Sequence, residues 1–346
     1  MSAVFDNTSA SGGTPDEHRD REALPPGRTL SGQISQFLHG YGLFVALVIA
    51  IGVFSILRPD AFFTTTNARA VLTLAAPLLI AALGLTIALA VNEIDLSVGS
   101  MIGLGGALAI CLMSFYDVPW ILAIAASLFL SLAVGLVIGA LVSIGGANSL
   151  IITLGMATFL TGLEFSLTNQ RTIYTNIDPT YVAIGQSYLM GMSLQVWIAG
   201  AMALIAWVLL EKTETGRFIY AIGANANAAF LAGVPVQKLR IFGFVCVALC
   251  GTISGILLTA QSASAFSNAG QPYLLPAFAA AFLGSTMSSD GRFTVIGTVV
   301  AVMFIGVIQT GLTMLQLSNG AINLAQGGLL IVAVMLSRIG KSKGGV

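Results

Sequence analysis

Three acidic residues lie in or beside long apolar stretches of the sequence, and they have the clearest potential for chemistry. Glu164 lies within one apolar stretch, whereas Glu93 and Asp95 lie between two others, in the run NEIDLS at 92–97. A carboxylate at membrane depth is costly unless it faces water or the protein interior, where it can bind an ion or line a solute path. Asp95 or Ser97 could instead cap the helix that follows, which is a structural role.

Uncharged polar side chains could line the same path. Thr161 is three residues before Glu164 and therefore shares its helix face, while Gln309 and Asn323 lie in the last two apolar stretches. The predicted path residues are Glu164, Thr161, Asn92, Asp95, Gln309 and Asn323. A buried packing network would account for the polar stripe around Glu164 at least as well, so both interpretations stay open at this point.

The sequence contains no motif for catalysis, metal binding or nucleotide binding. Its two histidines, His18 and His39, lie in or near the N-terminal segment, and its three cysteines all lie in apolar stretches. No G-x-x-x-x-G-K phosphate loop is present, and a net charge of zero without a basic patch argues against nucleic acid. We therefore predict that the chain is not an enzyme and binds no metal or cofactor of its own, so that any ATP it needs is bound by another chain.

The composition is that of a polytopic membrane protein. Hydrophobic residues make up 56% of the 346 residues and charged residues only 8%, against about 25% charged in soluble domains. A transmembrane helix needs about 20 mostly apolar residues, and windows of that kind predict an all-α fold of about ten spans. They are 41–57, 68–91, 98–116, 119–143, 148–168, 193–211, 241–260, 273–288, 293–315 and 321–338. The first and the eighth are short, so they could be tilted, broken or re-entrant.

The basic residues predict the orientation of these spans. Of the fourteen Lys and Arg residues, only Arg58, Arg69 and Arg171 fall outside when the N-terminus is placed in the cytoplasm, which leaves eleven inside. Both termini and the loop 212–240 are therefore expected to be cytoplasmic. Because this loop lies near the middle of the chain, the spans divide into two possible halves of five helices, as an inverted repeat would give.

The same reasoning divides the chain into a membrane domain between two tails. The predicted parts are a disordered cytoplasmic tail at 1–40, the transmembrane domain at 41–338 and a cytoplasmic tail at 339–346. The longest outer loop, 169–192, holds three tyrosines, an aspartate and an arginine. It could form a small lid or a docking surface for an external protein, or its tyrosines could simply mark the membrane boundary.

The inner loop 212–240 carries signals for one short helix. Asn225 or Asn227 can cap a helix over 226–231, and Gly233 stands where a C′ glycine would end it. The residues between them are mostly good helix formers. We therefore predict a single short helix between two membrane spans.

Two large apolar side chains, Phe230 and Leu231, would project from that helix. Burying each of them is worth about 1.5–3 kcal/mol, so leaving both in water is unfavourable. They could fold back onto the membrane face of this chain, or they could fill a groove on a separate cytoplasmic subunit.

One segment of this loop resembles the cytoplasmic coupling loop of permease subunits from bacterial carbohydrate ATP-binding-cassette (ABC) importers of the ribose type. It reads T-x-T-G-R-F-I-Y-A-I-G-A-N-x-x-A-A-x-L-A-G-V-P-V. The runs NEIDLSVGS at 92–100 and GQPYLLPAFAAAFLG at 270–284 are also similar to that family, although Leu274 stands where the family has an acidic residue. The resemblance covers about residues 40–338.

The resemblance implies that the short helix docks on an ATP-hydrolysing subunit. The residues expected in that coupling contact are Thr215, Gly216, Arg217, Asn225, Ala228, Ala229, Phe230, Leu231 and Gly233. It also implies two ATPase subunits that bind ATP and Mg²⁺, a periplasmic sugar-binding protein, and a second permease copy, identical or related, among the lipids of the inner membrane.

The function implied by the resemblance is import of a monosaccharide, such as a ribose-like pentose, by alternating access. A polyol or an autoinducer-type sugar derivative would suit the same machinery. An ion-driven secondary transporter is a rival from another class, and it would have to use Glu164 or Glu93, neither of which has an evident partner in the sequence.

Overall fold

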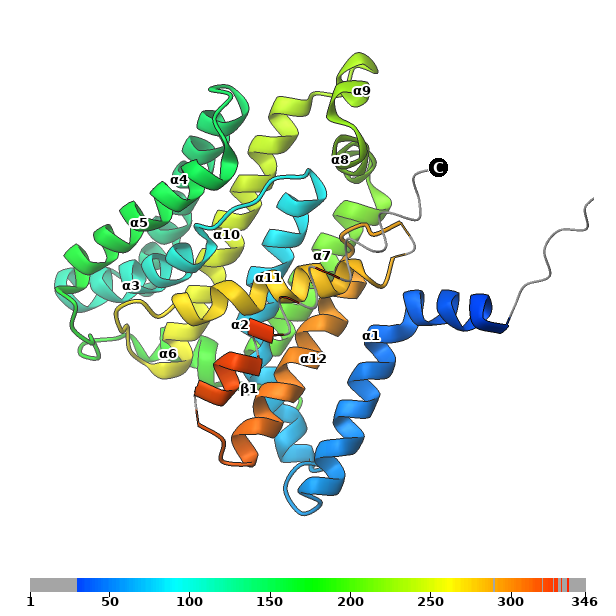
Figure 1. Ribbon diagram of the computed structural model, residues 1–346. Helices are drawn as coiled ribbons and strands as arrows, with labels where there is room; N and C mark the ends of the chain where they lie inside the picture. The colour runs from blue at the N-terminus through cyan, green and yellow to red at the C-terminus, as the bar shows by residue number, and fades with distance from the viewer. Residues whose placement is uncertain are drawn as a thin grey trace, which may run out of the picture.

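The computed structural model describes residues 30–288, 290–318, 320–325, 327–328, 331 and 335, and it is predominantly helical (Figure 1). The first six helices are α1 (Leu30–Leu57), α2 (Thr65–Ala90), α3 (Val98–Tyr116), α4 (Trp120–Ser143), α5 (Ser149–Thr168) and α6 (Pro179–Gln186). A small hairpin follows, in which β1 (Tyr188–Leu189) pairs antiparallel with β2 (Met192–Ser193). The next six helices are α7 (Leu194–Lys212), α8 (Glu214–Ala224), α9 (Ala226–Leu231), α10 (Val236–Ser262), α11 (Gln271–Ser285) and α12 (Val295–Met314).

Seven of the described helices are long and apolar enough to cross a membrane: α2, α3, α4, α5, α7, α10 and α12. Each coincides with a predicted span. The predicted span 41–57 is the apolar part of α1, which already begins at Leu30, and 273–288 corresponds to α11, which has only 15 residues. The span 321–338 lies largely outside the described residues. A count of about ten spans is therefore not confirmed.

Two hydroxyl side chains at the end of α11 bond to its own last turn. The hydroxyls of Ser285 and Thr286 donate to carbonyl oxygens one turn back, at 2.7 Å each. Serine and threonine that bond to nearby backbone compete with helix continuation. The chain then leaves the helix, so the apolar window read from the sequence does not give a full-length span.

Helices α2 and α10 form the centre of the molecule. α10 packs along α2, α3 and α4. Gly84 of α2 allows the close approach, because a Cβ placed there would lie 2.8 Å from the Cβ of Cys250 on α10. Ser254 of α10 also donates a hydrogen bond of 2.8 Å to the carbonyl of Pro77 inside α2. Small residues that let backbones approach are the usual means of packing helices in a membrane.

α3 and α11 each begin after an irregular segment, and the starts of the two helices lie next to each other. Residues 91–97 join α2 to α3, and residues 263–270 join α10 to α11. The two helix starts touch, since a Cβ on Gly270 would collide with the Gly99 carbonyl oxygen. The packing is reciprocal, because α3 lies on α10 and α11 lies on α2. Figure 1 shows α11 crossing the middle of the molecule.

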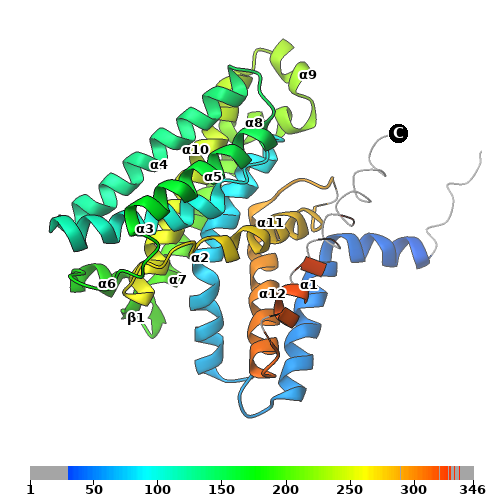
Figure 2. The ribbon, with the colours of Figure 1, turned by 60° about the vertical axis from the view of Figure 1, so that its left-hand side comes forward.

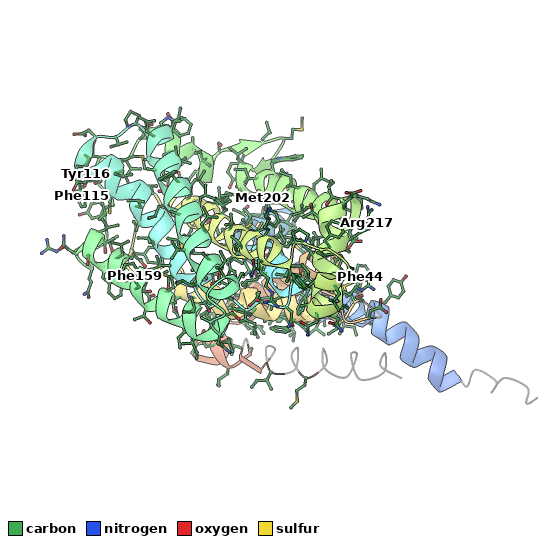
Figure 3. The ribbon with its side chains drawn as sticks, turned by 90° about the horizontal axis from the view of Figure 1, so that it is seen from above. Phe44, Phe115, Tyr116, Phe159, Met202 and Arg217 are labelled. Carbon is green, nitrogen blue, oxygen red and sulfur yellow. The ribbon has the colours of Figure 1, made fainter. Side chains whose placement is uncertain are left out.

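The two ends of the bundle carry different loops (Figures 1 and 2). One end carries α8 and α9, and the opposite end carries the α1–α2 turn, α6 and the β1–β2 hairpin. The outer helices α4, α5 and α7 are buried over less than a third of their membrane-length windows. Their large apolar side chains face outward, as Phe159 of α5 does at the edge of Figure 3. These helices are available to lipid or to another membrane subunit.

The outer loop 169–192 folds against the bundle. Tyr181 of α6 is fully buried, and its hydroxyl lies 2.6 Å from the Thr259 hydroxyl of α10. Tyr174 and Tyr188 are exposed instead. One tyrosine thus fixes the loop and the other two lie at its surface, so a docking role and a boundary role both remain predictions.

Candidate functional site

Segment 212–240 forms two helices, where the sequence predicted one. The additional helix, α8, is capped by Thr213, whose hydroxyl accepts a hydrogen bond of 3.2 Å from the Gly216 amide. Ile219 and Ile222 are buried and lie three residues apart, so α8 rests an apolar face on the bundle. This helix anchors the segment before α9 begins.

Two glycines bring α8 close to the ends of longer helices. A Cβ on Gly216 would collide with the Leu210 carbonyl of α7, and one on Gly223 would collide with the Ala90 carbonyl of α2. Glycine is needed where one backbone approaches another this closely. The first of these two residues therefore fixes α8 rather than offering a surface to a partner.

Arg217 is the charged member of the predicted coupling set. It lies at the rim of the molecule in Figure 3, and its guanidinium is 3.5 Å from the carboxylate of Glu214. Both side chains are exposed, and such pairs contribute about 0–1 kcal/mol. Thr215 beside them is half-buried. Arg217 is therefore accessible from outside.

α9 begins and ends where the sequence predicted. Asn225 is the cap that is used, because its side-chain oxygen accepts hydrogen bonds of 3.1 and 3.0 Å from the amides of Asn227 and Ala228. Gly233 has a φ of 84°, in the left-handed region that a C′ residue adopts. The predicted cap and stop are both confirmed.

α9 presents two large apolar side chains to its surroundings. Phe230 is 69% exposed and Leu231 is 85% exposed, and Ala228 is exposed beside them. Ala229 is instead only 6% exposed and packs into the hydrophobic core. The short helix thus turns Ala229 toward its own bundle, and the expected part of Ala229 in the coupling contact stays a prediction.

A chain of contacts joins α8 to α11. The Tyr220 hydroxyl lies 3.1 Å from the Phe293 carbonyl oxygen and 3.1 Å from the Glu211 carboxylate. The Phe293 ring meets Phe282 edge-on at a centroid distance of 5.5 Å, and Phe282 stacks on Phe278 at 6.4 Å. Such aromatic pairs are worth about 0.5–1.5 kcal/mol beyond the area they bury. The contacts connect the helix beside α9 to the interior of α11.

Asn92 lies at the same end of the molecule as this chain of contacts. It lines a cavity of about 440 Å³ together with Tyr220 and Arg292, and its φ of 63° turns the chain after α2. Asparagine tolerates that left-handed conformation better than most residues. The structure therefore separates Asn92 from the other predicted path residues.

Glu93 has a partner that the sequence did not reveal. Arg240 Nε of α10 lies 3.2 Å from Glu93 Oε1, as an ionic contact without hydrogen-bond geometry. Burial raises the pKa of the Glu93 carboxyl, whereas a hydrogen bond with Ser149 and the charge of Arg240 act in the opposite direction. Arg240 is therefore the partner of Glu93 that was not evident in the sequence.

Asp95 is fully buried in the same segment. Its Oδ1 accepts hydrogen bonds from the amide and the hydroxyl of Ser97, while its Oδ2 has no hydrogen-bond partner among the described residues. Burial raises the pKa of Asp95 to about 6. Ser97 occupies the cap position of α3 but makes no side-chain cap bond to a described residue. Asp95 therefore shapes the turn into α3.

Glu164 lies where α3, α5 and the start of α11 meet. It is 1% exposed, and its Oε1 accepts a hydrogen bond of 2.7 Å from the Asn268 amide. A Cβ on Gly103 of α3 would lie 2.5 Å from its Oε2. Thr161, one turn earlier, lies 3.0 Å from the Ser100 hydroxyl of α3. These contacts support the packing-network interpretation and give Glu164 a partner that the sequence did not show.

Gln309 and Asn323 line one cavity of about 480 Å³ with residues from α2, α11 and α12. The polar members of its lining are Asn67, Tyr273, Gln309, Thr310, Thr313 and Asn323. The predicted path residues therefore fall into separate groups. Asn92, Asp95 and the Glu164–Thr161 pair lie elsewhere. Gln309 and Asn323 are the two predicted path residues that share this cavity.

Seven membrane-length helices and an anchored, outward-facing short helix define a polytopic membrane protein with one specialised end. Residues 67–336 match the family described as branched-chain amino acid transport system / permease component. The chain belongs to this family of transport components. The family membership expected from the coupling loop is thereby confirmed.

The relatives of the chain are permeases of nearly the same length. The ribose import permease protein RbsC of Haemophilus influenzae is 33% identical over 306 residues, which cover 88% of this chain and 94% of the relative. RbsC of Escherichia coli strain K12 is 33% identical over 297 residues, covering 84% and 91%. The D-allose transport system permease protein AlsC of the same strain is 30% identical over 303 residues, covering 88% and 93%. No solved structure matches the chain.

Proposed function

We propose that this chain is the transmembrane subunit of an ABC importer that moves a monosaccharide across the bacterial inner membrane. The named substrates of its relatives, ribose and D-allose, support a sugar. The observation that carries the proposal is the exposure of Phe230 and Leu231 on a helix whose two ends are fixed.

The partner at α9 is an ATPase subunit that binds ATP and Mg²⁺. Phe230 and Leu231 together would gain about 3–6 kcal/mol from full burial, at about 1.5–3 kcal/mol each. Arg217 and Ala228 lie exposed in the same segment and extend the contact. Asn225, Gly216 and Gly233 hold the surface in shape. We place this end and both termini in the cytoplasm, and the distribution of basic residues supports that orientation.

Transport follows from movement of this end relative to α11. When ATP binding draws the ATPase subunits together, α9 and α8 move with them. The contacts from Tyr220 through Phe293 to Phe282 carry that displacement into α11, whose start lies against α3. The reciprocal packing of α2–α3 and α10–α11 favours two inverted halves that rock about this point.

Two further partners belong to this proposal. A periplasmic sugar-binding protein docks at the opposite end of the bundle, where Tyr174 and Tyr188 are exposed. A second permease copy, identical or related, covers one of the outer helices, of which α5 is the least buried. The remaining outer surface faces membrane lipid.

The rival from another class, an ion-driven transporter, is less well supported. Glu93 is paired with Arg240, and Glu164 accepts a backbone hydrogen bond within a packed junction. Neither carboxylate is placed as an open ion ligand. A polyol or an autoinducer-type sugar derivative remains compatible with the same machinery and is the second candidate for the solute.

The test is a charge placed on α9. Leu231→Glu should abolish co-purification of the ATPase and uptake of labelled D-ribose or D-allose, because an unpaired charge in that contact costs several kcal/mol. Protein level should stay normal, since Leu231 is 85% exposed. Leu189→Glu, on exposed β1 at the opposite end, is the matched control and should retain the ATPase. Normal co-purification with Leu231→Glu would refute the proposed coupling surface.

A further inference from the structure

The cavity between α2, α11 and α12 lies in the half of the molecule away from α8 and α9. Its α2 residues reach from the start of that helix to its midpoint at Leu78, and its α12 residues come from the second half of α12. These parts of α2 and α12 lie toward the end opposite α8 and α9 (Figures 1 and 2). Pro272, Tyr273 and Pro276 from the start of α11 complete its wall. A discontinuous helix that begins at a cavity is a recurring feature of transporter binding sites.

The lining chemistry favours an uncharged ligand. None of the described residues that line the cavity is Asp, Glu, Lys, Arg or His. Gln309 and Asn323 each offer both donors and an acceptor, and Thr310 offers a hydroxyl. Tyr273 adds an aromatic ring on which an apolar sugar face can rest. A charged solute would lose its hydration here without an ion partner.

Asn67 gives an independent sign that this wall is built for a polar ligand. The residue is 6% exposed, and its Nδ2 donates a hydrogen bond of 2.7 Å to the Phe62 carbonyl, which fixes the amide. Its Oδ1 is buried and has no hydrogen-bond partner among the described residues. Buried polar atoms are nearly always paired, so this acceptor of a cavity-lining residue marks an unmet hydrogen bond beside the cavity.

We propose that this cavity is the solute-binding site of the permease, and that it accepts uncharged polyhydroxylated solutes and excludes zwitterions such as amino acids. The proposal rests on the proposed function and adds to it the place of the site and the basis of its selectivity. The family description names branched-chain amino acids, whereas the relatives are ribose and D-allose permeases. An uncharged binding site would explain why this chain sides with the sugar permeases.

The experiment measures uptake by cells that carry the complete importer, with D-ribose, D-allose and L-leucine as labelled probes at concentrations well below saturation. Thr310→Val and Gln309→Ala each remove one neutral hydrogen bond, so the uptake rate should fall roughly 2- to 13-fold. Tyr273→Ala should lower it as well, whereas Tyr273→Phe should retain most of it because the ring is kept. ATPase co-purification should be unchanged in all four variants.

The matched control is Ser262→Ala on α10. Ser262 is exposed, and its hydroxyl donates to its own helix at Leu258, 3.0 Å away, so this variant should transport at the wild-type rate. Wild-type uptake by the Thr310, Gln309 and Tyr273→Ala variants would overturn the cavity proposal and leave the importer proposal standing. Uptake of L-leucine but of neither sugar by the unaltered chain would overturn both.

Discussion

Replacing Glu164 by Gln and by Leu tests whether this carboxylate ties α3, α5 and the start of α11 together. Glu164→Gln keeps an oxygen that can accept from the Asn268 amide, which now lies 2.7 Å from the carboxylate. Hydrogen bonds to charged groups are worth about 1.5–3 kcal/mol and neutral ones about 0.5–1.5 kcal/mol, so Gln should cost about 1 kcal/mol. Leu removes this charge-assisted bond and leaves the Asn268 amide without its acceptor, which should cost up to about 3 kcal/mol.

Thermal unfolding of the purified protein in detergent measures this order. The apparent unfolding temperature should fall slightly for Glu164→Gln and several-fold further for Glu164→Leu. Thr158→Val, which removes a hydroxyl elsewhere on α5, is the control and should leave that temperature unchanged. Glu164→Gln should still insert in the membrane and change sugar uptake only modestly. A Glu164→Leu variant as stable as the wild type would refute the idea that Glu164 holds α3, α5 and the start of α11 together, because its bond to the Asn268 amide would then not stabilise the fold.

Three other changes test the anchoring of the coupling end. Gly216→Ala pushes a Cβ into the preceding carbonyl and should lower the unfolding midpoint, whereas Gly200→Ala, with open space around it, should not. Asn225→Ala should cost about 1 kcal/mol of helix stability, measured as faster amide exchange in α9, and Asn225→Asp should restore it. Arg240→Ala should destabilise more at pH 8 than at pH 5, because the raised pKa of Glu93 lets it become neutral as pH falls, and Glu93→Gln should remove that difference.

The parts of the coupling end that could be predicted depend on local signals. A cap residue such as Asn225 and a C′ residue such as Gly233 act within a few residues of their own position, so sequence spacing is enough to find them. The same holds for the seven long spans, because apolar length is itself local. α8 was missed because only the cap and stop signals around 226–231 were used to place a helix in this loop, although Ile219 and Ile222 carried an amphipathic signal of their own.

The contacts that could not be predicted join distant parts of the chain. Burial of Ala229 depends on which side of α9 meets the core, and six residues are too few to define a face. The pairing of Glu93 with Arg240 and the contact of Tyr220 with Phe293 each link segments that only the packing of α2, α8 and α10 brings together. Spacing in the sequence holds no trace of such distances.

The shortness of α11 bears on how the chain enters the membrane during synthesis. Its 15 residues rise about 22 Å at 1.5 Å each, less than the hydrocarbon core of about 30 Å. α12 and α2 are the helices that cover α11, and α2 is already made when α11 emerges. In a chain released before α12 is complete, α11 therefore lacks one of the two helices that cover it and is too short to span the membrane by itself, even though every residue of α11 has been synthesised.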